Sequence, residues 1–481
     1  MSEVVFNRRL RFVDGVISLS KNEENLGQKI YLLESANHFM TNNHCGVFSY
    51  APMENMLKEI GKSFAVKKEG ECKKNSFLHV MTRTFTTGGH TKLVENFLFN
   101  RGQYDGECHD VLLLNNNDPD LPLFLQKINK ENRLYDLSGL NVLDKILELV
   151  EVSQKYENII LHHNMYDVLP IIALSQFSST KNIFVYNHAD HLYWVGSSIV
   201  KFSLEMSTDG MNFSQSNRGG GKCYLLPIPL STKQAIETTL KDSLSIADDE
   251  KVILTIGHEH RYHVKENEYS FKDVIKEVLK VDKKVVFIVV GEHSEAFWGD
   301  LWQSENVRFV GAINRDEINS YYSIADIYVD SFPMGGGTST LDAITFDIPS
   351  IKVKHIFFEF DSLKSSVVES KEVSKKIIGL LDGNSGVVGL VEPHLTTKWN
   401  LTFDEIIKDI KKTSLNSKVM KVEDNYSNNL YEYQSKARKQ LLNRSFLKLS
   451  LQNKIKYLIC LLRFESDFME IINIVKDKIK K

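Results

Sequence analysis

The chain has 481 residues, which is enough for two α/β domains and additional segments. Apolar residues make up 42% and the formal charge is −3, so the composition excludes wholesale disorder and a global attraction to nucleic acid. The five cysteines lack CxxC spacing, which argues against a disulfide framework or a zinc site. The N-terminus lacks the apolar core of a signal peptide, and no apolar run approaches the ~20 residues of a membrane span. The sequence therefore predicts a cytoplasmic protein.

Two helical patterns and a polar break occupy the first 76 residues, which we treat as an N-terminal extension. From residue 77 onward, short apolar runs alternate with helical patterns. The strands predicted in this part lie at 77–81, 110–115, 158–163 and 182–188. Such alternation is typical of a parallel, doubly wound sheet, so residues 77–230 are predicted to form a Rossmann-like domain.

The alternation restarts after "CYLLPIPL" (223–230), which holds two of the nine prolines and is interpreted as a crossing between domains. Strands are predicted at 251–257, 283–291, 306–313 and 326–332. Residues 231–400 are therefore predicted to form a second Rossmann-like domain. The two domains define an α/β fold with a cleft between them, and ligands of such sheets bind where the strands end.

Residues 401–481 are predicted to be helical and basic, with twelve Lys or Arg against four Asp or Glu from Lys436 to Lys481. The simpler interpretation is a solvated helical face packed on the domains. Peripheral contact with a membrane is the alternative.

The segment "VDSFPMGGGTSTLDAITF" (329–346) places glycines, hydroxyl residues and a carboxylate at a predicted strand-to-helix turn. A helix end offers free backbone N–H groups and a partial positive charge, which suit phosphate. The glycines let the backbone approach a ligand, the hydroxyls can cap the helix and bind phosphate oxygens, and the carboxylate can accept hydrogen bonds from ribose. A capped helix with no ligand is the competing interpretation. The residues concerned are Gly335, Gly336, Gly337, Thr338, Ser339, Thr340 and Asp342.

A second loop of the same domain, "GHEHRYHVKE" (257–266), follows the strand "KVILTI". His258, Arg261 and Lys265 follow a glycine at that strand end, where cations can clamp the same phosphates. Two loops with phosphate chemistry at one sheet edge favour a nucleotide diphosphate site over an exposed charged loop. The Walker and GxGxxG patterns are both absent from the sequence.

In the first domain, "TRTFTTGGHTKLVENFL" (82–98) puts Gly88, Gly89 and His90 between the first strand and the first helix. A histidine can take the proton of an attacking hydroxyl because its pKa matches neutral pH. A turn histidine that caps the helix is the competing interpretation.

A polar and aromatic cluster, "YNHADHLYWVG" (186–196), follows the predicted strand 182–188. His188 or His191, oriented by Asp190, can supply a base, and Tyr193 and Trp194 can stack on a sugar. The spacing of the two histidines is not enough to predict a metal site.

Several other polar residues are weaker candidates. The glycine-containing stretch 206–221 is interpreted as a mobile loop, and we expect its arginine not to bind phosphate. Two carboxylates in "HIFFEFDS" have no defined partner, and two adjacent histidines at a predicted strand end are given a structural role. These residues are Arg218, Glu359, Asp361, His162 and His163.

At this point the chain resembles the GT-B glycosyltransferases, whose two Rossmann-like domains close on a nucleotide sugar. "GGGTSTLDAITFDIPSI" looks most like the O-GlcNAc transferase type. That resemblance implies that Thr338 and Ser339 touch diphosphate, that Asp342 holds the ribose, and that His258 and Arg261 contact phosphate. It also implies that "FVGAI" (309–313) binds the base through backbone groups.

The resemblance implies an enzyme that moves a sugar from a nucleotide sugar, UDP-linked, to an acceptor hydroxyl, with no metal or other cofactor. The acceptor is a surface polysaccharide, a lipid-linked glycan or a protein. The E-x7-E motif of a large retaining group is absent, since Met334 stands eight residues before Asp342, which favours inversion. A sugar-nucleotide 2-epimerase of the same fold, and a non-catalytic nucleotide-sugar-binding scaffold, are the alternatives.

Overall fold

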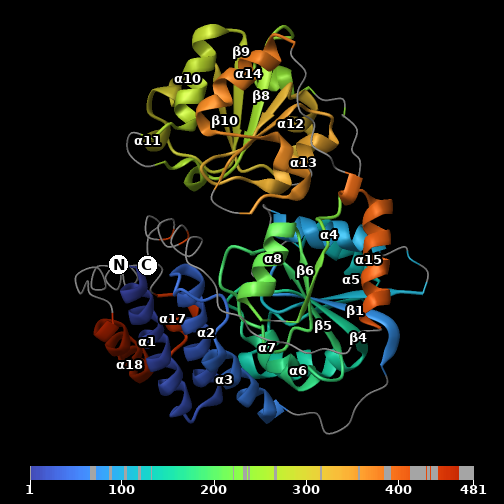
Figure 1. Cartoon of the computed structure of the whole chain (residues 1–481), viewed down its shortest axis with the longest axis vertical. Coiled ribbons are helices and arrows are strands. Elements are labelled where there is room, and N and C mark those ends of the chain that lie inside the picture. The colour runs from blue at the N-terminus through green and yellow to red at the C-terminus, as the bar shows by residue number, and fades with distance from the viewer. Residues whose placement is uncertain are drawn as a thin grey trace.

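The structure is a computed structural model. It describes residues 2–64, 72–85, 89–101, 104, 106–116, 121–131, 133–219, 221–230, 236, 239–264, 268–314, 317–355, 358–383, 392–411, 430, 434 and 442–464. Two α/β domains lie one above the other, and a group of helices flanks the lower one (Figure 1).

The first domain is built on a seven-stranded sheet in which every strand pair is parallel, in the order β3-β2-β1-β4-β5-β6-β7. Its strands are β1 (Lys73–Met81), β2 (Cys108–Leu113), β3 (Leu134–Asp136), β4 (Tyr156–His162), β5 (Asn182–Asn187), β6 (Phe202–Glu205) and β7 (Lys222–Leu225). Its helices are α4 (Gly89–Arg101), α5 (Leu123–Lys130), α6 (Val142–Gln154), α7 (Leu169–Leu174) and α8 (Thr208–Asn217).

The second domain repeats this plan with a six-stranded parallel sheet in the order β10-β9-β8-β11-β12-β13. Its strands are β8 (Lys251–Ile256), β9 (Val285–Val290), β10 (Val307–Gly311), β11 (Ile327–Val329), β12 (Ser350–Val353) and β13 (Val367–Val368). Its helices are α9 (Leu240–Ser243), α10 (Phe271–Val281), α11 (Glu295–Trp298), α12 (Ile318–Ile324), α13 (Gly337–Thr345) and α14 (Val373–Leu381).

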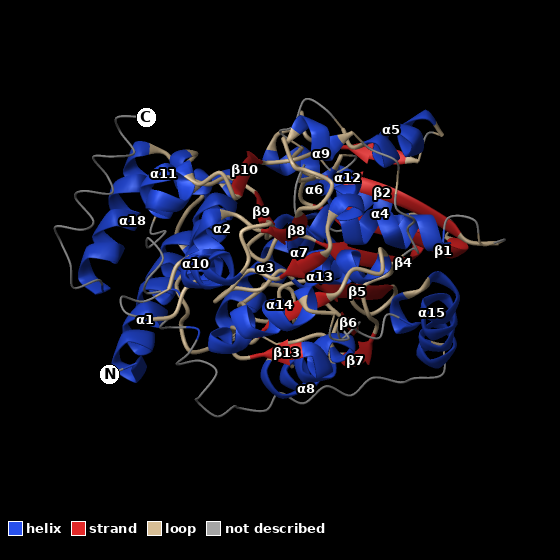
Figure 2. Ribbon diagram, turned by 90° about the horizontal axis from the view of Figure 1, so that it is seen from above, coloured by secondary structure: helices blue, strands red, loops and turns tan. Residues whose placement is uncertain are grey.

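The hydrophobic pattern explains these elements. Every residue of β9 is buried, as expected for a central strand that helices cover on both faces (Figure 2). The crossover helix α10, which connects β8 to β9, buries one stripe of apolar residues and begins with a capping box between Ser270 and Asp273. The predicted α/β fold with two Rossmann-like domains is therefore confirmed.

The terminal segments form a helical layer against the first domain. Helices α1 (Ser2–Lys21), α2 (Leu26–Asn42) and α3 (Ala51–Gly61) share one hydrophobic core with α6, α7, α17 (Arg444–Leu447) and α18 (Leu451–Phe464). The opposite face of the first sheet is covered by α4 and by α15 (Thr396–Ile410), and α15 spans the predicted boundary at residue 400. No described helix has the length and apolar character needed to cross a membrane.

Three expectations about loops are wrong. The stretch 206–221, expected as a mobile loop, contains α8, because Ser207 caps the helix by accepting from the Gly210 N–H. The predicted crossing at 223–230 begins inside the sheet, since β7 pairs with β6. Asp361, expected without a partner, joins the two domains by accepting hydrogen bonds from the backbone and hydroxyl of Thr208, at 2.7 and 2.9 Å.

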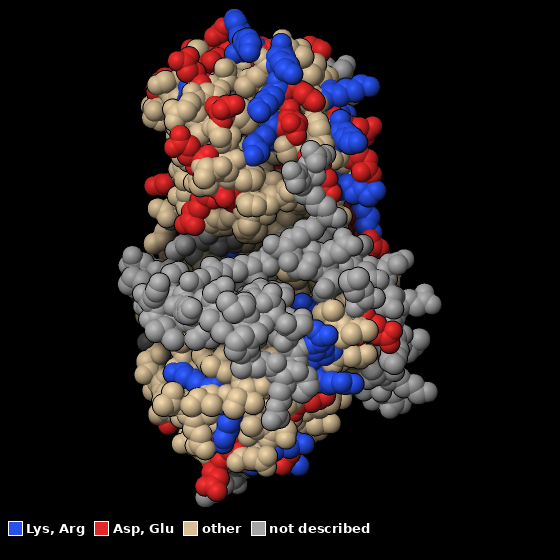
Figure 3. Space-filling view, turned by 90° about the vertical axis from the view of Figure 1, so that its left-hand side faces the viewer, with Lys and Arg blue, Asp and Glu red and all other residues tan. Residues whose placement is uncertain are grey.

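Acidic and basic side chains are interspersed over the surface of the second domain (Figure 3). This mixed pattern agrees with the small formal charge of the chain. It gives that domain no extended field of one sign on the face shown.

Candidate active site

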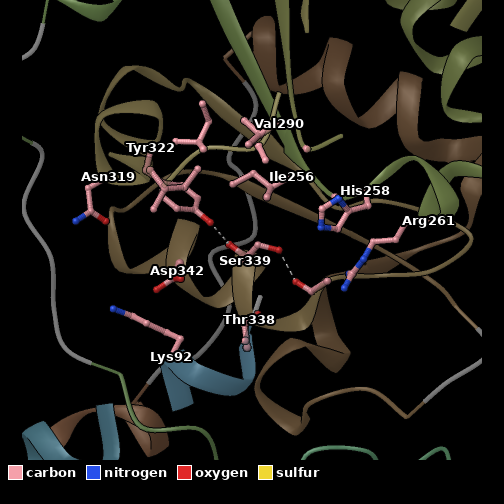
Figure 4. A pocket seen from close by; sticks show the side chains of 17 residues that line it. Lys92, Ile256, His258, Arg261, Val290, Asn319, Tyr322, Thr338, Ser339 and Asp342 are labelled. Atoms are coloured by element: carbon pink, nitrogen blue, oxygen red, sulfur yellow. Dashed lines mark hydrogen bonds between the residues drawn. The ribbon is translucent and has the colours of Figure 1, made fainter. Parts of the chain in front are cut away.

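The strand orders place a switch point in each domain, where crossovers leave neighbouring strands in opposite directions. In the first sheet the switch lies between β1 and β4, and in the second between β8 and β11. The loops after these strands open a crevice, which is where doubly wound sheets bind ligands. A pocket occupies this position and takes residues from both domains (Figure 4).

The pocket is lined by the ends of β8 and β9, the start of α13, one face of α12 and the start of α4. The lining residues are Gly89, Lys92, Ile256, Gly257, His258, Arg261, Val290, Gly291, Ala312, Ile313, Ile318, Asn319, Tyr322, Gly336, Thr338, Ser339 and Asp342. Six of the predicted site residues are therefore brought together from two loops and from α13, and Gly89 joins them from the other domain.

The first turn of α13 forms one wall of the pocket. The helix begins at Gly337 after the N-cap Gly336, which has no side chain with which to cap it. The expectation that hydroxyls cap this helix is wrong, because Ser339 Oγ donates back to the Gly336 carbonyl at 2.7 Å. The Ser339 and Thr340 N–H groups also bond to that carbonyl, at 3.0 and 3.3 Å. Among the described residues, the Gly337 and Thr338 N–H groups have no such partner and are left for a ligand.

Of the three hydroxyl residues and three glycines in this segment, not all reach the pocket. Thr338 and Ser339 line it, whereas Thr340 is fully buried and its hydroxyl has no partner among the described residues. Gly337 faces Phe360, whose ring a Cβ atom would meet at 2.3 Å. Asp342 lies one turn further into α13 and points into the pocket (Figure 4).

A buried ion pair supports the glycine loop from behind. Asp330, at the end of β11, accepts hydrogen bonds from the backbone N–H of Ser331 at 2.9 Å and of Gly336 at 2.8 Å. Its other carboxylate oxygen pairs with the Lys352 ammonium, and both side chains are fully buried. Glu359, which had no predicted partner, lies 3.5 Å from Lys352 Nζ and 3.0 Å from His355 Nε2. The loop conformation is therefore fixed by charges that do not face the pocket.

Cationic side chains approach the pocket from both domains. Arg261 Nη1 donates to the Gly335 carbonyl at 3.0 Å, which holds the guanidinium beside the glycine loop. His258 Nδ1 accepts from the Glu292 N–H at 3.5 Å. Lys92, which the sequence analysis did not single out, extends from α4 toward Asp342 (Figure 4). Lys265 lies outside the described residues.

The far wall of the pocket is apolar. Ile256, Val290 and Ile313 line it, and Tyr322 donates a hydrogen bond from its hydroxyl to the Ser339 carbonyl at 3.1 Å. Ala312 and Ile313 belong to the segment 309–313 that was predicted to bind a base. A planar, weakly polar group fits this wall, and an anionic group fits the opposite one.

At Gly89 the backbone of the first domain closely approaches a side chain of the second domain. A Cβ atom at this position would lie 2.8 Å from Thr338 Cγ2, closer than atoms approach without a shift. Gly88 lies outside the described residues. The glycine thus allows α4 to start directly against the first turn of α13.

His90 follows Gly89 and is held by a backbone carbonyl. Its Nε2 lies 2.7 Å from the His162 oxygen at the end of β4, so Nε2 carries the proton and Nδ1 has the free lone pair. Nδ1 has no hydrogen-bond partner among the described residues. Burial, and then the neighbouring His188, hold the pKa of His90 well below 6.5, so the ring is neutral at pH 7.

His188 contacts His90 with ring centroids 4.4 Å apart and lines a second, small cavity with His163 and Trp194. Its Nδ1 donates to the Tyr186 carbonyl at 3.2 Å, and burial lowers its pKa to about 4. Asp190 Oδ1 lies 3.3 Å from His191 Nδ1, so the expected carboxylate and histidine do pair, but neither lines the pocket between the domains.

Two weaker expectations agree with the structure. His162 is buried and its Nε2 lies 3.0 Å from His79 Nδ1, while His163 Nε2 donates to the Val195 carbonyl at 3.0 Å. Arg218 is buried, and its guanidinium donates to the carbonyls of Leu192 and Asp190 rather than to the pocket. Among the residues that the structure describes, no group of three or more His, Cys, Asp or Glu could hold a metal ion.

Comparison with known proteins gives the class of the fold. No protein-family model matches the sequence, and no curated protein matches it either. HepE from Anabaena, solved with UDP and glucose, has a TM-score of 0.51 at 12% identity over 69% of this chain and 99% of that one. A glycosyltransferase from Rickettsia africae ESF-5 has a TM-score of 0.51 at 13% identity over 71% of this chain and 100% of that one.

A putative UDP-N-acetylglucosamine 2-epimerase from Listeria monocytogenes has a TM-score of 0.46 at 9% identity, over 71% of this chain and 98% of that one. Likenesses at such low identity show the fold and not the activity. The predicted GT-B architecture is confirmed: the chain has the two-domain fold of these glycosyltransferases.

Proposed function

We propose that the protein transfers a sugar from a nucleotide sugar to an acceptor hydroxyl. The observation that carries this proposal is the pocket at the switch points of both sheets. It joins a helix N-terminus and two cations, Arg261 and Lys92, to an apolar wall. A nucleoside diphosphate matches this arrangement, with its phosphates at the start of α13 and its base against Ile313 and Tyr322.

The donor is a UDP-sugar, by the same proposal. HepE, which the chain resembles in fold, was solved with UDP and glucose. Asp342 lies one turn into α13, at a distance from the helix start that suits ribose hydroxyls next to the phosphates. His258, Arg261, Thr338 and Ser339 would contact the diphosphate.

The reaction would be a direct displacement at the anomeric carbon, with inversion. The acceptor oxygen forms a bond to that carbon while the bond from the carbon to the β-phosphate oxygen breaks. The acceptor proton passes to Nδ1 of His90, and the charge that develops on the diphosphate is stabilised by Arg261, Lys92 and the end of α13. These groups supply the electrostatic stabilisation with no metal ion in the proposed step.

His90 suits the role of base for two reasons. Its tautomer leaves Nδ1 free to take a proton, and its neighbour Gly89 lines the donor pocket. Its ring also contacts His188, which lines the small cavity of the first domain. We propose that the acceptor approaches from the first domain, as a glycan, a lipid-linked glycan or a protein in the cytoplasm.

The 2-epimerase alternative is less well supported by the pocket. We would expect that activity to need paired carboxylates in the cleft, as acid and base. Asp342 is the one carboxylate among the described residues that line the pocket. A single acidic group suits ribose binding better than acid and base catalysis on the sugar ring.

The experiment is incubation of the protein with several UDP-sugars, with and without an acceptor extract, while free UDP and the sugar configuration are followed. We expect UDP release that depends on the acceptor. His90→Gln should reduce it about 100-fold or more, since general base catalysis contributes on this order. UDP affinity should stay unchanged in this variant. His263→Gln is the matched control, because the His263 side chain is exposed and does not line the pocket.

Other outcomes would replace the proposal. A sugar that changes configuration while it stays on its nucleotide would identify an epimerase. Nucleotide binding without turnover of any UDP-sugar would identify a scaffold protein. Full activity in His90→Gln would remove His90 from the mechanism while leaving the transferase in place.

A further inference from the structure

Helix α18 presents a row of large apolar side chains to solvent. Leu451, Ile455 and Ile459, spaced four residues apart, are 75%, 50% and 45% exposed. Residues at this spacing lie on one face of a helix. The last residue of α17, Leu447, is exposed as well. Exposed apolar side chains scattered singly are ordinary, but a continuous row along one helix indicates a contact surface.

The opposite face of α18 fixes this orientation. Tyr457 and Leu461 are buried in the core of the helical layer, and the Tyr457 ring contacts Phe12 of α1 with centroids 5.2 Å apart. The Asn453 side chain donates to Glu23 at 2.7 Å, near the end of α1. The helix therefore cannot roll to hide its apolar row without breaking a packed core.

The apolar row is accompanied by positive charge. Residues 442–464 include five Lys or Arg and no Asp or Glu. Arg444, Lys448 and Lys456 are exposed beside the apolar residues. Figure 3 shows both basic and acidic side chains on this side of the lower half, so the excess of positive charge is a property of residues 442–464 themselves. An apolar stripe flanked by Lys and Arg is the pattern of helices that lie in a membrane interface.

We propose that this face, formed by Leu447, Leu451, Ile455 and Ile459 with the adjacent basic residues, docks on an anionic lipid surface. The charge favours this partner. The apolar row would enter the boundary of headgroups and acyl chains, and the basic groups would meet lipid phosphates. A second copy of the chain would bring basic rows together across a twofold axis, which like charges oppose.

The surface lies on the half of the molecule that is proposed to receive the acceptor. The helical layer packs against the first domain, and the second domain lies above it (Figure 1). Docking would therefore place the first domain near lipid-linked acceptors, a consequence that rests on the proposed function. The docking itself depends only on the surface of α18.

The test is co-sedimentation of the full chain with phosphatidylcholine vesicles, with and without about 30% phosphatidylglycerol. We expect binding to the anionic vesicles and weakening of that binding by salt. Leu451→Ser, Ile455→Ser and Ile459→Ser combined should lower the partition coefficient at least about tenfold. The matched control is Leu147→Ser with Leu401→Ser, two exposed leucines of α6 and α15 that are 51% and 54% exposed. It should bind vesicles like the unchanged protein.

Four results would overturn the docking proposal. The first three are no binding of the unchanged chain to anionic vesicles, an equal loss of vesicle binding in the two variants, and a dimer that the α18 substitutions convert to monomer. A fourth is binding that appears only after residues 465–481 are deleted, since those residues would then cover the face. UDP affinity should be the same in both variants, so loss of docking and loss of the proposed transferase activity are distinguishable.

Discussion

At Gly89 a single missing side chain decides how closely the two domains approach. The position faces Thr338 at the start of α13, and the next residue, His90, is held by the His162 carbonyl. The first two residues of α4 thus serve two different parts of the site. The backbone, rather than another side chain, selects the tautomer of the proposed base.

Buried histidines also have consequences away from the site. The His44 ring lies between Phe6 and Phe48, with centroids 5.2 and 4.9 Å away, and neither ring nitrogen has a partner among the described residues. Burial, together with Arg9 and Arg218, lowers the pKa of His44 to about 3. Because the unfolded chain binds this proton near pH 6.5 and the folded protein does not, His44 makes folding less favourable as the pH falls below 6.5.

We predict that His44→Phe removes this penalty. A phenyl ring fits the aromatic surroundings and carries no proton. The loss of unfolding free energy between pH 7 and pH 5 should be about 2 kcal/mol smaller in the variant than in the unchanged protein. Urea unfolding at the two pH values measures it. An identical pH dependence in His44→Phe would show that His44 titrates normally in the folded protein.

At the scale of elements, the glycine loop between β11 and α13 depends on the ion pair behind it. Lys352 comes from β12 and Asp330 from the end of β11, and no solvent reaches either side chain. Loss of one partner leaves a buried charge uncompensated, whereas loss of both charges does not.

We therefore predict that Lys352→Met lowers the free energy of unfolding by about 3–5 kcal/mol and weakens UDP binding. Adding Asp330→Asn should recover most of the stability, because the amide oxygen still accepts from the Gly336 N–H. Urea unfolding and calorimetric UDP titration measure the two effects. Lys284→Met is the control: its pair with Asp249 is exposed, so the free energy of unfolding should stay close to that of the unchanged protein. A Lys352→Met protein as stable as the original would contradict this account.

Comparison of the predicted with the observed helices and strands shows which elements could be predicted from the sequence. Alternating apolar runs predicted the presence of both sheets, and strand ends located the loops at 257–264 and 330–337. The short strands β3, β6, β7 and β13, of two to four residues, were not predicted. Helix α8 was missed because its Gly, Ser and Asn residues have low helical propensity, and its cap and packing outweigh that preference. The role of Lys352 was not predicted because its partner, Asp330, lies 22 residues earlier in the chain, at the end of the neighbouring strand β11.

Residues that reach the site from helix faces were the hardest to predict. Lys92 stands two residues after His90, and its role depends on how the first domain sits against the second. Asn319 and Tyr322 come from α12, where nothing in the sequence distinguishes them from ordinary helix residues. The sequence identifies the hydroxyl residues 338–340 as candidate ligands, but which of them faces the pocket depends on where α13 begins.

At the scale of the whole molecule, several contacts between described residues join the domains around the pocket. Gly89 meets Thr338, Thr208 donates to Asp361, and Lys364 Nζ lies 2.9 Å from Asp209. Helix α15 then returns from the second domain to pack on the first. The pocket therefore takes residues from both domains, with Lys92 and Arg261 on opposite sides (Figure 4).

Calorimetric titration of UDP tests the central claim most directly, because the claim is that a diphosphate binds between these two cations at the start of α13. We predict that the unchanged protein binds UDP. Arg261→Met should raise the Kd about 10–100-fold, and Lys92→Met about tenfold, as charge-assisted hydrogen bonds of this kind are worth. The control is Lys272→Met, because the Lys272 ammonium donates to the Phe297 carbonyl outside the pocket; this variant should leave the Kd unchanged. Failure of the unchanged protein to bind UDP, or equal affinity in all three variants, would contradict the account.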